Sequence, residues 1–193
     1  MNKFSLIALT LLAYALPCLA APGADFVIKK VELDSPLSPD FQQNQQNPTI
    51  RWAPQKWVKM EVTFDAVPDN TEELVFNYYV YFAKRLFVGH VTHVNITKGH
   101  DLHSVMYMSP KALLRAVQRA TPLPNWPIEQ ISVTITKPGV AEPLAIGNLK
   151  GQANAAWWAS MKQEEGFLMN KSETPFAPLC WDHYEAVKPA AAR

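Results

Sequence analysis

Alternation of apolar and polar residues is the clearest pattern in the chain. Between residues 56 and 64 every second side chain is apolar: Val58, Met60, Val62 and Phe64. The same period recurs over residues 128–136, where the apolar set is Ile131, Val133 and Ile135. A period of two is typical of a β-strand with one face in a core and the other toward water. We therefore predict strands over both segments.

Five further segments are rich in β-branched and aromatic residues, which also predicts strands: residues 25–33, 74–82, 85–97, 102–108 and 140–149. In the first of them the apolar phase changes between Ile28 and Val31, which indicates a β-bulge or a switch between sheets. Turn residues lie between neighbouring strands at 68–70, 98–100 and 138–139. We expect the last of these turns to close a hairpin.

One short helix is expected after residue 108. Ser109 and Pro110 supply an N-cap and a first helical residue for the ten residues that follow. One face of this helix would carry Leu113, Leu114 and Val117. Residues 152–165 also contain helix-forming residues and end at Gly166, but the pair of tryptophans within them fits a strand equally well.

These elements predict an all-β fold. Seven or so short strands, turn signals about every ten residues and one or two short helices are typical of an immunoglobulin-like antiparallel β-sandwich. A partly open barrel is the alternative architecture, because periodicity does not fix the order of the strands. The 193 residues, 48% of them hydrophobic, suit one domain with its own core.

The first twenty residues have the layout of a secretory signal peptide. Lys3 is their one charge, residues 4–16 are apolar, and small residues follow at Ala20 and Ala21. As a helix the apolar run would reach about 20 Å, short of the roughly 30 Å of a bilayer core. We expect cleavage near Ala20 and a single domain at 21–193 that is secreted, periplasmic or at the cell surface, and that meets the membrane only through export.

Cleavage at that point would remove Cys18 and leave Cys180 as the one thiol. An intrachain disulfide would then be excluded. Because free cysteine is among the most buried residue types, we expect Cys180 to be a small buried residue rather than half of an intermolecular bridge.

Charge and motif content exclude several function classes. With 18 basic and 17 acidic residues the chain lacks the basic surplus that nucleic-acid binding requires. Its seven glycines form no phosphate loop or dinucleotide fingerprint, and neither a Gly-x-Ser-x-Gly elbow nor a His-Glu-x-x-His helix is present. We therefore predict no catalytic residue, no cofactor and no enzyme activity. A hydrolase with carboxylates paired by the fold stays as an alternative.

Four of the five histidines fall within fourteen residues, so we ask whether they could bind a metal ion together: His90, His93, His100 and His103. A turn at 98–101 would pair His103 with Ile96, place His93 on the other face and leave His90 roughly 20 Å along the strand. That register excludes a four-ligand site, and we predict no metal. A two-ligand site of His100 with Asp101 or His103 is the remaining alternative.

Tryptophan is abundant, with six residues, and suggests a second function class. Exposed indole rings stack on sugar faces, so a carbohydrate-binding module with a glycan partner is the alternative function. The candidate stacking residues are Trp126, Trp157 and Trp158. Anchoring of the core and of loops is the favoured role for these rings, because large aromatic side chains dominate burial in small sandwiches.

A segment near the C-terminus carries a family resemblance. Residues 170–187 read NKSETPFAPLCWDHYEAV and follow Trp157-Trp158 and Gly166-Phe167-Leu168. They resemble the closing segment of secreted pilus-like proteins that Akkermansia-type verrucomicrobia encode beside type IV pilus assembly genes, and the strand at 56–64 with its Lys-Trp start is similar to theirs. The resemblance implies an exported immunoglobulin-like sandwich, without known enzyme activity, that acts in pilus-like assembly or adhesion.

The same resemblance implies protein partners: further copies of the chain, pilus machinery or a host surface. The chain differs from pilins in its leader, because no acidic residue lies in its apolar run and the leader has a removable form. This difference favours an accessory or surface factor over a filament subunit.

The closing segment, about residues 167–187, also has a physical role of its own. Pro175 and Pro178 fix an extended path. Apolar side chains can then enter a groove from Phe176, Leu179, Trp181 and Tyr184. We expect this segment to close the sandwich as its last strand or to serve as a partner-binding segment. The sequence therefore predicts an exported, non-enzymatic sandwich that acts through protein–protein interaction.

Overall fold

The structure is a computed structural model that describes residues 24–39, 53–118, 128–149, 156–180 and 182–189. Two long antiparallel strands dominate it, β2 (Val58–Phe82) and β3 (Arg85–Met108). Ala83 and Lys84 form the tight turn between them, with φ of 53° and 61°. Two consecutive residues at positive φ match the right-handed twist of a two-residue hairpin. This hairpin is the frame on which the other strands assemble.

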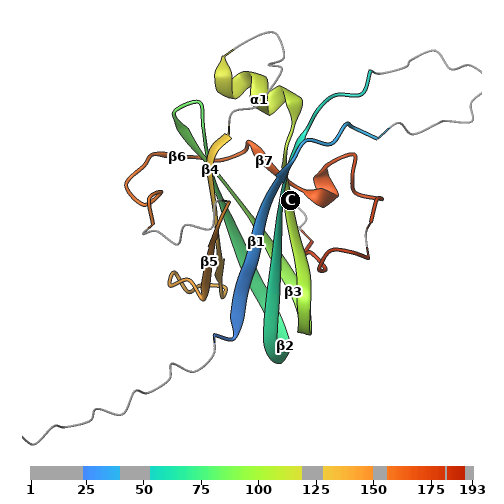
Figure 1. The fold of residues 1–193 in the computed structure, drawn as a ribbon, viewed down its shortest axis with the longest axis vertical. Coiled ribbons are helices and arrows are strands. Elements are labelled where there is room, and N and C mark those ends of the chain that lie inside the picture. Colours follow the sequence, from blue (N-terminus) through green and yellow to red (C-terminus); the bar gives the residue numbers. More distant parts are fainter. Residues whose placement is uncertain (1–23, 40–52, 119–127, 150–155, 181, 190–193) are drawn as a thin grey trace, which may run out of the picture.

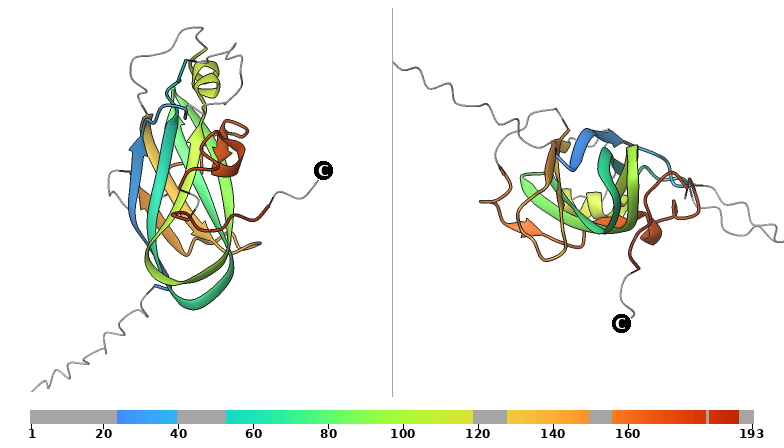
Figure 2. Two further views of the ribbon diagram at one scale, coloured as in Figure 1. Left: turned by 90° about the vertical axis from the view of Figure 1, so that its right-hand side faces the viewer. Right: turned by 90° about the horizontal axis from the view of Figure 1, so that it is seen from below.

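The hairpin passes through two layers of one folded sheet. In the first layer, the opening half of β2 pairs with β1 (Phe26–Asp34), and the closing half of β3 pairs with β7 (Leu168–Asn170). In the second layer, the closing half of β2 pairs with β4 (Ile128–Thr136), which pairs with β5 (Ala145–Asn148). There the opening half of β3 pairs in parallel with β6 (Gln163–Glu164). Figures 1 and 2 show the sheet curving back on itself.

The core lies between the two layers and uses the alternating residues that the sequence indicates. The first layer contributes Met60, Val62 and Phe64, and the second contributes Phe76, Tyr78, Val80, Ile131, Val133 and Ile135, all with 0% exposure. Burial of each such apolar side chain stabilises the fold by about 1.5–3 kcal/mol. The predicted all-β, sandwich-like class is confirmed, although the parallel pairing of β3 with β6 makes the sheet mixed.

The edges β1 and β5 approach each other on one side of the sandwich, where Figure 1 shows them next to each other. Gly147 of β5 makes this approach possible, because a Cβ atom there would fall 2.3 Å from Cγ2 of Ile28 in β1. The expected bulge in β1 is present, as a register shift between Ile28 and Lys30. It lets Phe26 and Val31 both reach the core although they lie five residues apart.

Two of the predicted turns are wrong. Residues 68–70 and 98–100 do not reverse the chain but lie within β2 and β3, which stay paired across them. Register shifts between Phe64 and Asn70, and a positive φ at Asp101, absorb the polar residues as irregularities of the ladder. As a consequence His103 is opposite Thr63, and not opposite Ile96 as the assumed turn required.

The expected helix is confirmed as α1 (Pro110–Val117), where the Ser109 hydroxyl accepts a hydrogen bond from the Ala112 amide at 3.2 Å. Of the ambiguous segment at 152–165, the described part from 156 forms turns and β6, with no helix. A short 3-10 helix, η1 (Lys171–Glu173), begins the closing segment beyond β7. Among the described residues, no helix has the length and apolarity needed to cross a membrane.

The closing segment covers the outer face of the first layer. Phe176 is 7% exposed, stacks on Tyr107 of β3 with ring centroids 4.8 Å apart and meets Trp57 edge-on at 5.6 Å. Two short parts of it join the sheet: β7 pairs with β3 at its beginning, and near its end Val187 forms a bridge with His93 and the Lys188 amide donates to the Thr92 carbonyl. The segment therefore packs mostly as a cover over the sheet and not as a full last strand.

A buried polar chain ties this segment to the core. The Tyr78 and Ser104 hydroxyls lie 2.8 Å apart, and Ser104 Oγ lies 2.8 Å from His93 Nε2. Because the Glu185 carbonyl only accepts, His93 Nδ1 carries the proton and donates to it at 3.0 Å. Nε2 is then an acceptor for Ser104, so the neutral form of His93 satisfies both of its partners. Burial lowers the pKa of His93 to about 4, against the opposing effect of hydrogen bonds to Glu185 and Ala186.

We expect Phe176→Ala to lower the free energy of unfolding by about 2–4 kcal/mol, because it removes a buried ring from between Trp57 and Tyr107. Leu179→Ala is the matched control in the same segment; Leu179 is 41% exposed, so its loss should stay within about 0.5 kcal/mol. Urea unfolding of the chain from residue 21 measures both values. Equal stability of the wild type and Phe176→Ala would contradict this packing role.

Acid should destabilise the fold through His93. Its folded-state pKa is lower than the ordinary 6.5, so the unfolded chain binds the proton more readily. The stability that this residue contributes is present above about pH 6.5 and is lost as the pH falls toward 4, by up to about 3 kcal/mol. Urea unfolding at several pH values, for the wild type and His93→Gln, isolates this contribution. The variant should show the smaller pH dependence, and identical pH dependence in both proteins would refute the assignment.

Candidate functional site

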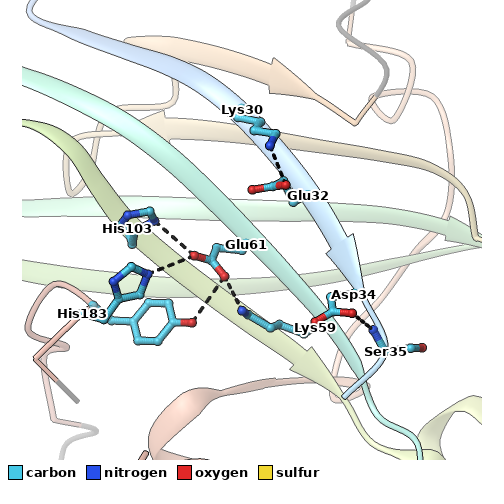
Figure 3. Close-up of polar contacts among 9 residues, drawn as sticks. Lys30, Glu32, Asp34, Ser35, Lys59, Glu61, His103 and His183 are labelled. Carbon is cyan, nitrogen blue, oxygen red and sulfur yellow. Dashed lines mark hydrogen bonds and ion pairs between the residues drawn. The ribbon is translucent and has the colours of Figure 1, made fainter. Parts of the chain in front are cut away.

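Three polar side chains from distant parts of the chain meet on the outer face of the first layer. Glu61 lies on β2 and His103 on β3, and the register that pairs Thr63 with His103 places both on that face. His183 comes from the closing segment, and the backbone holds it in place because the Glu185 amide donates to the His103 carbonyl at 3.1 Å. We refer to Glu61, His103 and His183 as the outer-face cluster (Figure 3).

One oxygen of Glu61 is the meeting point of the cluster. Its Oε1 lies 3.1 Å from Nδ1 of His103 and 3.3 Å from Nε2 of His183, which donates a hydrogen bond to it. One nitrogen of each histidine and a Glu61 oxygen all lie within 4.8 Å of one another. The two imidazole rings stack, with centroids 4.0 Å apart and planes 27° apart. Both rings therefore present nitrogen toward the same carboxylate oxygen.

The other oxygen of Glu61 is held by two neighbours. The Tyr184 hydroxyl donates to Oε2 at 3.3 Å, and Lys59 forms an ion pair with the same oxygen. The ammonium of Lys59 also lies 6.0 Å from the centre of the Tyr184 ring. These contacts fix the orientation of the carboxylate, which is 14% exposed, and leave Oε1 turned toward the histidines.

Electrostatics favour a carboxylate beside neutral imidazole. Burial alone would raise the pKa of Glu61, but hydrogen bonds from Lys59 and His183 and the positive charge of Lys59 outweigh it and lower the pKa. Burial and the neighbouring His183 lower the pKa of His103, although Glu61 acts in the opposite direction. At neutral pH the cluster therefore offers a carboxylate oxygen and an unprotonated imidazole.

One atom of the cluster is unsatisfied. His103 Nδ1 is buried and has no hydrogen-bond partner among the described residues, although it lies 3.1 Å from Glu61 Oε1. A buried polar atom without a partner carries a desolvation cost of about 1–3 kcal/mol. Two imidazoles and a carboxylate are ligands that zinc and related divalent ions accept. The arrangement can therefore hold a cation.

Sequence reasoning missed two members of this cluster. His103 stood among the candidate histidines, but Glu61 and His183 did not, because the assumed turn at 98–101 paired His103 with Ile96 and the order of the other strands was left open. The usable signal was the alternation from Val58 to Phe64, which puts Glu61 on the outer face of its strand.

The structure does not assemble the two-ligand alternative. His100 Nδ1 lies 2.9 Å from Asp65 Oδ2, and Asp101 Oδ1 accepts a hydrogen bond from Lys29 at 2.8 Å. His90 is exposed and His93 is in the core, so the four histidines occupy separate environments. The structure thus places these four histidines apart, and the register assumed for His103 in that prediction was wrong.

The residues predicted for the closing segment divide into covered and exposed positions. Phe176 is buried and Tyr184 half-buried, whereas Pro175 and Leu179 are exposed, and Trp181 lies outside the described residues. The expected alternation into one groove is therefore wrong at Leu179, because the chain forms consecutive turns between 174 and 180. Cys180 is exposed with a φ of 47°, so the expectation of a buried thiol is also wrong.

The tryptophan pair serves as an anchor on the outer face of the second layer. Trp158 is 6% exposed and stacks on Tyr79 of β2, with ring centroids 4.5 Å apart. Trp157 is half-buried and donates from Nε1 to the Ser132 hydroxyl at 2.6 Å. A sugar-stacking role is therefore not supported for Trp158, whose ring face is already covered by Tyr79. Trp126 lies outside the described residues.

Comparisons with known proteins agree with this architecture. No curated protein matches the chain. A solved structure from Akkermansia muciniphila matches with a TM-score of 0.71 and 20% sequence identity, over 86% of this chain and 93% of that one. At that identity the likeness shows a shared fold. A protein-family model matches residues 19–191, nearly the whole chain. The protein therefore belongs to the family that this model describes.

Proposed function

We propose that the protein is an exported, non-enzymatic β-sandwich that binds protein partners, foremost further copies of itself, in pilus-like assembly or adhesion at the cell surface. The observation that carries the proposal is the family match over residues 19–191. The signal-peptide layout of residues 1–20 supports export. The shared fold with the Akkermansia muciniphila protein supports a sandwich as the working unit.

One flank of the sandwich has the properties of an assembly surface. β5 ends the order of strands in the second layer, and β1 lies beside it at the margin of the first. Strands at a sheet margin present backbone groups that can pair with another chain. Exposed apolar side chains occur on these strands and on the loop before β5: Val27 is 46% exposed, Val140 48% and Ile146 41%.

Alternation along the strands directs these side chains outward. Gly147 faces Ile28 and Val31 within the sandwich, so its neighbour Ile146 points to the other side. Val27 is likewise the outward neighbour of the buried Phe26. In Figure 1 the beginning of β1 and the loop between β4 and β5 lie at the same end of the molecule. We name Val27, Val140 and Ile146 the flank residues. A second copy placed here would cover apolar surface and extend the sheet at once.

The assembly proposal is tested by sedimentation velocity on the chain from residue 21. We expect concentration-dependent self-association that Ile146→Lys weakens at least tenfold, because a charge replaces an apolar contact beside an edge strand. Leu179→Lys is the matched control, since Leu179 is equally exposed, at 41%, but lies on the closing segment. A wild-type chain that stays monomeric, or two variants that associate alike, would contradict assembly through this flank.

Export has its own test. Fractionation of the producing cells, with N-terminal sequencing of the recovered protein, should place the chain outside the cytoplasm and start it near Ala21. A full-length chain that stays in the cytoplasm with Met1 attached would remove the basis for a cell-surface role.

A further inference from the structure

We propose that the outer-face cluster of Glu61, His103 and His183 binds a divalent transition-metal ion, zinc above all, and that this ion ties the closing segment to the first layer of the sheet. This proposal does not depend on the proposed function. It differs from the expectation that the chain has no metal site, which rested on a different pairing of His103.

The donor set selects the kind of ion. Two imidazole nitrogens and one carboxylate oxygen suit zinc, copper, nickel and cobalt, whereas calcium and magnesium require shells of oxygen. Three protein ligands leave a fourth position for water in a tetrahedral site. His183 is 46% exposed, so solvent reaches this side of the cluster.

The spacing of the donor atoms fits such an ion. A tetrahedral zinc ion with ligands at about 2.0–2.2 Å separates neighbouring ligand atoms by about 3.3–3.6 Å. In the structure, Glu61 Oε1 lies 3.1 Å from His103 Nδ1 and 3.3 Å from His183 Nε2. One nitrogen of each histidine lies within 4.8 Å of the other, so a shift of the side chains would bring all three donor atoms to a common ion.

An ion would also resolve the unsatisfied atom of the cluster. His103 Nδ1 is buried without a hydrogen-bond partner in the described part of the chain, and a metal bond would use its lone pair. Glu61 Oε2 already accepts a hydrogen bond from Tyr184 and forms an ion pair with Lys59, which Figure 3 shows. These two residues would form the outer shell that orients a metal-bound carboxylate.

The charge of Lys59 limits the affinity. Its ammonium neutralises Glu61 and lies beside the position of the cation, which opposes binding. We therefore expect dissociation constants in the micromolar range, weaker than those of closed structural zinc sites. The ion would nevertheless join residues that are 122 positions apart along the chain, Glu61 and His183, and so hold the closing segment over the sheet.

Calorimetry on the tag-free chain from residue 21 tests the proposal, with zinc chloride as the probe and calcium chloride as the matched ion. We expect one zinc ion per chain and no heat of binding with calcium. At a hundredfold excess over its dissociation constant, zinc should raise the melting temperature by about 5–10 °C. Absence of zinc binding below about 100 μM would overturn the proposal.

Variants locate the ion. Glu61→Gln and His183→Gln should each weaken zinc binding at least tenfold, because each substitution replaces a metal ligand by a neutral amide of similar size. His90→Gln is the matched control, since His90 is an exposed histidine away from the cluster. Circular dichroism and melting without zinc show whether each variant is folded. Binding that His90→Gln reduces, or that both cluster variants retain, would assign the ion to another place.

Hydrogen exchange tests whether the ion holds the closing segment against the first layer of the sheet. The Glu185 amide donates to the His103 carbonyl, at the point where the closing segment meets β3. Zinc should slow exchange of this amide at least tenfold in the wild type and leave it unchanged in His183→Gln. Unchanged exchange in a zinc-saturated wild type would overturn the tying role.

Discussion

Continuous pairing of β2 with β3 is the constraint on which the rest of the structure depends. The two strands pair along their length, from the turn at Ala83 and Lys84 to the far end at Val58 and Met108, with register shifts only between Phe64 and Asn70. The hairpin therefore runs through both layers of the sandwich. Their inward side chains fill the core from two sides. Their outward side chains form the platforms that the closing segment and the tryptophan pair cover.

Sequence patterns predicted the features that depend on near neighbours. Alternation from Val58 to Phe64 identified the core face, the phase change after Ile28 identified the bulge in β1, and Ser109 identified the start of the helix. These signals are local, because side-chain direction and capping depend on residues two to four positions apart. The all-β class followed from them.

The features that sequence reasoning missed depend on register across long separations. Polar residues at 68–70 and 98–100 have the composition of turns, yet the ladder continues through them, since a bulge accommodates the same residues without reversing the chain. Placing Glu61 near His103 required that register, and placing His183 there required the path of the closing segment as well. The sheet that this register builds has β1 and β5 at one margin, where we propose assembly, and the outer-face cluster on the layer that contains β1.

The register of the β2–β3 hairpin thus determines the positions of the core residues and of the outer-face cluster. Nuclear Overhauser effects between backbone protons measure this register directly. The account predicts cross-strand effects between Thr63 and His103 and between Thr71 and Ile96. Effects between Ile96 and His103, which would indicate a chain reversal near Gly99, would contradict it.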